Sequence, residues 1–274
     1  MVENKEILTN LNINEIIDRV KKSEQDVIYL AGSLIEGIGN KYSDIDVYIL
    51  TDLKKIDGCE YNEKYSKTAF FTLNGKHFDI EYWDKGLIHE LIRQSNENNL
   101  SDLNIRSYNL IKIENLSFKD MMSFIHRFNT GYPIYNANEF DKYKNELNIA
   151  YICKFASRAI INKVDAIYED IIGCVEEKEL DSAVLSCKIQ ILELMRAYIF
   201  SFSETIDRSK WIIKRLELLG EKSSEASKIH QEFRNLYFGS ALSKCPSELN
   251  SYIEKSLEFT NKVIDLIAMK NCGI

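Results

Sequence analysis

Short apolar runs separated by polar turns characterise the first half of the chain. Val27–Ala31 and Val47–Leu50 are rich in β-branched and aromatic residues, which predicts two buried strands. Residues 69–73 and 77–83 flank Asn74-Gly75, a dipeptide that suits the positive φ angles of a type I′ turn, so they predict a hairpin. Amphipathic helices are expected around these strands, at residues 13–20, 87–93 and 118–128.

From about Asn138 onward the apolar residues follow the period of helices. They recur every three or four positions with few turn signals, as in residues 186–202. Further helices are predicted at residues 211–219, with Gly220 as the C-cap, and at residues 247–269. Such stripes are typical of the core of a helical bundle.

These two patterns together predict an α+β protein. Residues 1–135 are expected to form a mixed α/β head with a small sheet, and residues 136–274 a C-terminal helical bundle. The boundary follows Gly131-Tyr132-Pro133, where a glycine and one of the chain's 2 prolines interrupt the pattern.

Composition excludes several classes of protein. Of the 274 residues, 45% are hydrophobic and 28% are charged, which is ordinary for a globular protein and excludes a disordered or fibrous chain. A formal net charge of −7 disfavours nucleic acid as a bulk substrate. The chain has no run of about 18 apolar residues to span a membrane, no signal-peptide core at its N-terminus, and no C-x-x-C pair among its 6 cysteines. We therefore expect a cytoplasmic protein with reduced thiols and no membrane partner, and the oligomeric state stays open.

One segment between the first two strands combines a glycine–serine turn with two acidic residues. Gly32-Ser33 ends the first strand, and Asp44-Ile45-Asp46 opens the second. Alternation along a strand places Asp44 and Asp46 on one face, about 6.5–7 Å apart. Their mutual repulsion is relieved by a cation, and carboxylates without His or Cys neighbours suit Mg²⁺ or Mn²⁺. Gly32 lets a ligand approach the backbone, and the Ser33 hydroxyl adds a donor for phosphate oxygens.

A third carboxylate is expected from the second strand of the hairpin. Asp79 and Glu81 share one face of that strand, and Asp79 follows an apolar residue where the strand nears the acidic pair. Asp79 is therefore favoured as the third metal ligand. Glu81 either takes that place, acts as general base for the acceptor hydroxyl, or is an exposed strand carboxylate. Ser43 either orients Asp44, contacts a phosphate, or caps a turn.

The order of these elements resembles the signature of the polymerase-β-like nucleotidyltransferase superfamily, over residues 27–83. The segment is most similar to small bacterial enzymes that adenylylate antibiotics and other hydroxyl compounds. A looser resemblance continues through His126-Arg127 and residues 131–135, a stretch that also fits a helix end and a turn. Lys210 and Lys214 lie in a segment similar to the helical domain of such enzymes. There they either reach the γ-phosphate or are ordinary solvated lysines.

The resemblance implies transfer of a nucleoside monophosphate to a hydroxyl of a small molecule. The expected group is AMP from ATP, or the corresponding monophosphate from another NTP. An aminoglycoside-like or natural-product acceptor fits, with pyrophosphate leaving. It also implies two Mg²⁺ ions, one held by Asp44, Asp46 and the third acid, and one held by Asp44 and Asp46. The alternatives are a nucleotide second-messenger synthase and a catalytically silent nucleotide-binding or antitoxin-like partner. A P-loop is excluded, because Ile38 stands where that motif has its lysine.

Overall fold

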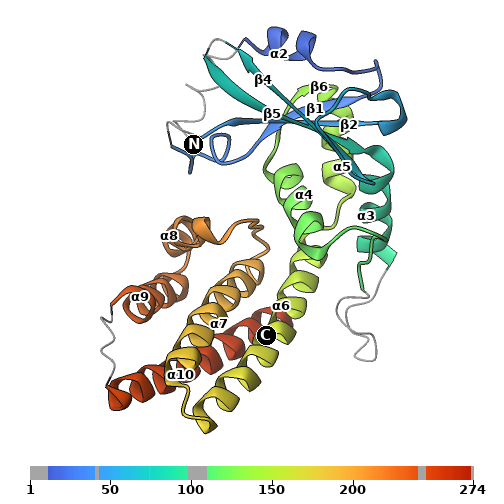
Figure 1. Cartoon of the computed structure of the whole chain (residues 1–274). Coiled ribbons are helices and arrows are strands. Elements are labelled where there is room, and N and C mark those ends of the chain that lie inside the picture. The colour runs from blue at the N-terminus through green and yellow to red at the C-terminus, as the bar shows by residue number, and fades with distance from the viewer. Residues whose placement is uncertain (1–11, 41–42, 74, 98–109, 240–244, 273–274) are drawn as a thin grey trace. The chain divides into compact units, whose positions relative to one another are not determined.

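The computed structural model describes residues 12–40, 43–73, 75–97, 110–239 and 245–272. It is α+β, as the sequence predicts, and it divides into two compact units (Figure 1). The described part of unit 1 ends at Ile149, and the described part of unit 2 begins at Ala150.

Unit 1 contains the strands and the helices that cover them. In chain order its elements are α2 (Ile13–Arg19), β1 (Val27–Ala31), β2 (Ile45–Thr51), the 3₁₀ turn η1 (Leu53–Lys55), β3 (Tyr61–Asn62), β4 (Ser66–Leu73), β5 (Lys76–Asp84), α3 (Lys85–Glu97), α4 (Phe118–Thr130), β6 (Tyr132–Tyr135) and α5 (Ala137–Glu146). The predicted strands and hairpin at residues 27–31, 47–50, 69–73 and 77–83 are thereby confirmed, with Asn74 of the turn outside the described residues.

Within the described residues, six strands form one mixed sheet in the order β3-β4-β5-β2-β1-β6. Strand β2 lies between β1, which is antiparallel to it, and β5, which is parallel. Helix α2 covers one face, while α3, α4 and α5 lie on the other (Figure 1). The side chains of alternate β1 residues point to opposite faces of the sheet. Ile28 packs in a cluster with Ile16 of α2, and Tyr29 packs against Phe128 of α4 and Phe140 of α5. Both faces of β1 are therefore buried, which explains its unbroken apolar sequence.

The end of unit 1 differs from the predicted boundary. Residues 132–135, expected to separate two domains, form the edge strand β6 beside β1, with Pro133 opposite Tyr29. Proline is tolerated there because an edge strand leaves one side of its backbone without a ladder partner. Helix α5 follows and packs Phe140 onto the sheet, so the compact unit continues to Ile149 rather than stopping at residue 135. A four-residue edge strand carries too little periodicity to be recognised in the sequence.

Unit 2 consists of helices packed on one another. Its elements are α6 (Ile149–Glu176), whose first residue belongs to unit 1, α7 (Leu180–Phe200), the 3₁₀ turn η3 (Ser209–Trp211), α8 (Ile212–Lys222), α9 (Ser224–Phe238) and α10 (Pro246–Cys272). One core cluster joins Ile171 of α6, Cys187 of α7 and Ile253 of α10. None of the described helices combines the length and the apolar character needed to cross a lipid bilayer.

Gly220 does not cap a helix, contrary to the sequence prediction. Helix α8 continues through it to Lys222, where Ser223 is the C-cap. A Cβ atom at Gly220 would lie 3.3 Å from the Cα atom of Ser227 on α9. The glycine therefore permits close packing of the two helices, a tertiary reason that sequence position does not reveal.

Candidate active site

Asp46 and Asp79 lie side by side on neighbouring strands. Strands β2 and β5 run parallel with these two residues as register partners. Partners in adjacent strands are about 4.8 Å apart, and their side chains point to the same face. Asp44 is exposed and immediately precedes β2, one residue before the Ile45–Phe78 pair. Three acidic residues therefore occupy one end of the sheet.

The Gly-Ser turn reaches the same end of the sheet from β1. Ala31, the last residue of β1, pairs with Asp46, and Gly32 follows with a φ angle of +86°. A Cβ atom on Gly32 would lie 1.8 Å from Oδ2 of Asp46. Glycine is needed here both for the positive φ angle and for the space that the carboxylate occupies. The Asp46 carboxylate thus lies directly against the backbone of the turn.

Hydrogen bonds within residues 32–43 hold the turn together. The backbone N–H groups of Ile38 and Gly39 donate to the carbonyl oxygen of Ser33, at 3.0 and 2.7 Å. The hydroxyl of Ser33 lies 3.3 Å from the hydroxyl of Ser43, which also accepts from the N–H of Asn40 at 3.1 Å. Ser43 was expected to orient Asp44, to contact a phosphate or to cap a turn. The structure shows its hydroxyl in hydrogen bonds within the turn.

Glu81 belongs to a partly buried polar cluster two residues beyond Asp79 on β5. One of its oxygens accepts from the Tyr48 hydroxyl at 3.0 Å, and the other accepts from Nε1 of Trp83 at 2.9 Å. The Arg127 guanidinium lies 5.7 Å from the centre of the Tyr48 ring. Burial raises the pKa of Tyr29 and of Tyr48 well above the usual value, and the negative charge of Glu81 adds to that rise. With both oxygens engaged, Glu81 is held as an acceptor for neutral donors and is not an exposed strand carboxylate.

An open hollow of about 590 Å³ lies beside the acidic residues. Its walls come from β4, β5 and the start of β2, and consist of Asp44, Phe70, Phe71, Thr72, His77, Phe78 and Asp79. The ring of Phe70 is 48% exposed, and Nδ1 of His77 lies 3.2 Å from the hydroxyl of Thr72. These lining residues include two carboxylates and no Lys or Arg. The hollow therefore suits cations and neutral hydroxyl compounds better than anions.

The same residues meet part of the requirement for a metal site. Asp46 and Asp79 supply hard oxygen donors at adjacent positions, and Asp44 shares the hollow with Asp79. Across the described residues, however, no three His, Cys, Asp or Glu side chains converge closely enough to hold a metal ion. The donor chemistry fits Mg²⁺, and a third carboxylate ligand would require the exposed Asp44 side chain to turn toward the pair.

Lys210 and Lys214 belong to unit 2 and interact with neighbours there. The Lys210 ammonium lies 4.8 Å from the centre of the Trp211 ring, and Lys214 pairs with Glu217 at 3.5 Å. Both side chains are exposed, as solvated lysines are.

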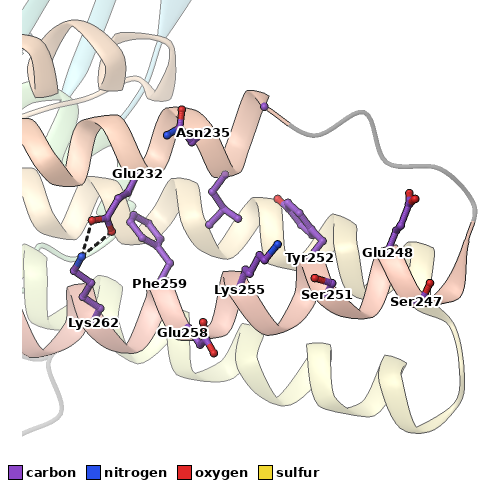
Figure 2. A pocket seen from close by; sticks show the side chains of 12 residues that line it. Glu232, Asn235, Ser247, Glu248, Ser251, Tyr252, Lys255, Glu258, Phe259 and Lys262 are labelled. Atoms are coloured by element: carbon purple, nitrogen blue, oxygen red, sulfur yellow. Dashed lines mark hydrogen bonds and ion pairs between the residues drawn. The ribbon is translucent and has the colours of Figure 1, made fainter.

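Unit 2 also contains a larger hollow, of about 730 Å³, between α9 and α10 (Figure 2). Leu236, Tyr252 and Phe259 form its apolar surface, and Lys262 pairs with both oxygens of Glu232 at 2.7 Å. Its lining includes none of the residues that the sequence assigns to the site. It lacks the juxtaposed carboxylates and glycine turn of unit 1, so the end of the sheet is the stronger candidate.

Two residues near the site, Glu36 and His77, are absent from the sequence-based assignment. Glu36, within the Gly-Ser turn, lies 3.1 Å from Nε2 of His126 on α4. His77 lies two positions before Asp79, so strand alternation alone would have placed both on one face. No comparable signal connects Glu36 with His126, because 90 residues separate them.

Comparison with known proteins gives only a weak likeness. No protein-family model matches the sequence, and no curated protein matches it. Among solved structures, the chain is similar to a nucleotidyltransferase-like protein from Exiguobacterium sibiricum. The two are 11% identical, the match covers 98% of this chain and 76% of that one, and the TM-score is 0.49. A likeness at this level does not bear on function.

Proposed function

We propose that this protein is a nucleotidyltransferase that moves a nucleoside monophosphate from an NTP to a hydroxyl of a small molecule. AMP from ATP is the expected donor group. One observation carries the proposal: Asp46 lies against the Gly32 backbone on one side and pairs in register with Asp79 on the other. This arrangement joins carboxylates for a cation to a turn with donors for phosphate, and an NTP–metal complex needs both.

The residues of the site form two groups, one that would bind phosphate oxygens and one that would bind the metal ion. The Ser33 hydroxyl and the backbone at Gly32 and Ser33 would face phosphate oxygens, because amide and hydroxyl donors suit anions. Asp46 and Asp79, joined by Asp44, would hold Mg²⁺. When bound, that ion would lower the pKa of the acceptor hydroxyl and would neutralise charge that develops on pyrophosphate. The acceptor oxygen bonds to the α-phosphorus, the bond from that phosphorus to pyrophosphate breaks, and the hydroxyl proton passes to water.

The hollow beside Asp79 is the proposed place of the acceptor. Asp44 and Asp79 make it acidic, and Phe70 offers an exposed aromatic face. A cationic or neutral hydroxyl compound, such as an amino sugar, fits these properties. A nucleic acid polymer would meet like charge, both here and in the net charge of −7.

A labelled-nucleotide assay tests the proposal. The protein is incubated with Mg²⁺, each α-labelled NTP and a panel of aminoglycosides and other hydroxyl compounds, and both pyrophosphate and the labelled product are measured. We expect an acceptor-dependent labelled product that disappears when EDTA is added. Asp79→Asn should remove this activity. The matched control Asp84→Asn, at the opposite end of β5, should retain it.

The remaining outcomes separate the alternatives. A nucleotide product formed without any acceptor would identify a second-messenger synthase. NTP binding without pyrophosphate release under any condition would contradict the transferase proposal and favour a silent nucleotide-binding protein.

A further inference from the structure

A buried acid–base pair connects the Gly-Ser turn to helix α4. Nε2 of His126 and Oε1 of Glu36 are 3.1 Å apart, and only 3% and 6% of these two side chains are exposed. Glu36 belongs to the turn after β1, whereas His126 lies in the middle of α4. The pair therefore attaches one wall of the candidate site to a helix that packs on the sheet.

The position of Glu36 is transmitted directly to Gly32. The backbone N–H of Glu36 donates to the carbonyl oxygen of Gly32 at 3.1 Å, and Gly32 in turn lies against the Asp46 carboxylate. Ile35, the preceding residue, is buried in the core cluster on the face that α2 covers. The turn is thus anchored on both faces of the sheet, by an apolar side chain on one and by the Glu36–His126 contact on the other.

The opposite end of this connection is also held in place. The Arg127 guanidinium, next to His126, lies over the Tyr48 ring of β2, and the carbonyl oxygen of His126 accepts from the Thr130 hydroxyl at 2.9 Å. Helix α4 therefore provides a fixed point for the pair. Burying two ionisable groups is costly, and the best-attested benefit of such a pair is that it selects one arrangement among several.

We propose that Glu36 and His126 are positioning residues that hold residues 32–39 in the shape that binds the phosphates of the nucleotide. This inference rests on the proposed function. Both residues act through the backbone of Gly32 and Ser33. Without the pair, every phosphate donor is still present, but the turn is no longer held in one conformation. Nucleotide affinity should therefore fall, while the affinity for the acceptor stays the same.

The variants Glu36→Gln, His126→Gln and the double variant test this inference with two readouts. Hydrogen exchange of residues 32–39 should accelerate about tenfold or more, because the local opening of the turn becomes easier. The Kd for a non-hydrolysable ATP analogue with Mg²⁺, and the KM for the NTP, should rise about tenfold, which is a loss of about 1.4 kcal/mol. The KM for the acceptor should not change. The double variant should resemble either single variant, because one interaction is lost in all three.

A matched control separates positioning from general destabilisation. Thr51→Val removes a buried hydrogen bond to Asp26, 2.9 Å long, at the other end of β2. It should lower the melting temperature without altering exchange in the turn or nucleotide affinity. If His126→Gln is too unstable to assay, Glu36→Gln carries the same prediction, since it replaces the carboxylate by a neutral amide of the same size.

The outcomes distinguish failure of this inference from failure of the proposed function. If the unmodified protein binds the analogue, and the variants match it in turn exchange and in Kd, the positioning role is wrong and the proposed function stands. If the unmodified protein does not bind the analogue, the proposed function fails and this inference fails with it.

Discussion

Among the described residues, the most deeply buried polar side chains of unit 2 include hydroxyls and an amide that join neighbouring helices, whereas those of unit 1 include an aspartate, a histidine and an arginine. The Ser157 hydroxyl of α6 donates to the carbonyl oxygen of Ala197 on α7 at 3.1 Å, and Gln190 of α7 donates to the carbonyl oxygen of Val164 on α6 at 3.0 Å. In unit 1, by contrast, Asp26, His126 and Arg127 are buried. Neutral groups that find backbone partners join helices at little cost, while buried charges cost more than they contribute to stability.

Two of these buried residues of unit 1 lie near the candidate site. His126 contacts the Gly-Ser turn, and Arg127 lies over Tyr48, whose hydroxyl binds Glu81. Both interactions therefore reach β1, β2 and β5 near the acidic pair. We infer that these buried groups of unit 1 help to position the candidate site.

The largest expected effect follows from removing one charge of the acidic pair. Asp46→Asn should reduce pyrophosphate release about 10³-fold, since a metal-binding carboxylate is lost from the reacting centre. The melting temperature should stay the same or rise, because repulsion with Asp79 is relieved. Steady-state kinetics and thermal melting measure the two effects.

Asp52→Asn is the matched control for that change. Asp52 lies beyond the other end of β2 and caps η1, accepting from the N–H of Lys54 at 3.2 Å. It should leave turnover unchanged. An Asp46→Asn protein that unfolds would show instead that the pair is structural.

The second effect concerns the space beside Asp46. Gly32→Ala should reduce activity about 10²-fold, because the new Cβ atom displaces the carboxylate that now lies 1.8 Å from its position. It should also lower stability by about 1–3 kcal/mol through strain at a positive φ angle. Urea unfolding and kinetics together measure both losses.

Gly75→Ala separates the clash from the strain. Gly75 has a φ angle of +75°, but a Cβ atom there would meet nothing within 4 Å. The control should lose stability through backbone strain and keep its activity. Equal activity losses in both variants would contradict a specific role for the Gly32–Asp46 contact.

A third, smaller effect compares equivalent hydrogen bonds in the two units. The Tyr48 hydroxyl binds Glu81 at 3.0 Å in unit 1, and the Tyr198 hydroxyl binds Glu225 at 2.8 Å in unit 2. Replacing either tyrosine by phenylalanine should cost about 1–3 kcal/mol of unfolding free energy, since a carboxylate loses a donor. Only Tyr48→Phe should also lower kcat, by several-fold. If Tyr198→Phe lowers kcat equally, the functional distinction between the units is wrong.

The smallest effect concerns the reactivity of cysteines in unit 2. Burial raises the pKa of the Cys153 thiol to about 12, whereas hydrogen bonds from Ser247 and neighbouring backbone lower the pKa of the exposed Cys245. Because the thiolate is the reactive form, iodoacetamide at pH 8 should modify Cys245 first and Cys153 only after unfolding. Mass spectrometry of the digested protein identifies the labelled cysteine. Rapid labelling of Cys153 would indicate that the packing of unit 2 is loose.

Local patterns in the sequence were enough to predict most elements of unit 1. The buried run at residues 27–31 and the alternating strands beside Asn74-Gly75 were recognised because strand signals lie within a few neighbouring residues. The Gly-Ser turn followed by Asp-x-Asp indicated a phosphate and metal site from local chemistry, and that site stays a prediction. Strand β6 was missed because its partner β1 is distant along the chain. Gly220 was misassigned because its role depends on how α8 packs against α9.

Residue order therefore accounts for which groups are present, and the folded arrangement accounts for which of them meet. Strand alternation predicted that Asp79 and Glu81 share a face, but their different surroundings follow from the register of β5 with β2. Asp79 falls opposite Asp46, and Glu81 falls opposite Tyr48, which engages it. The same holds for Glu36, whose partner His126 comes from α4. Parallel strand pairing and helix packing join residues far apart in the chain, so no local period encodes these contacts.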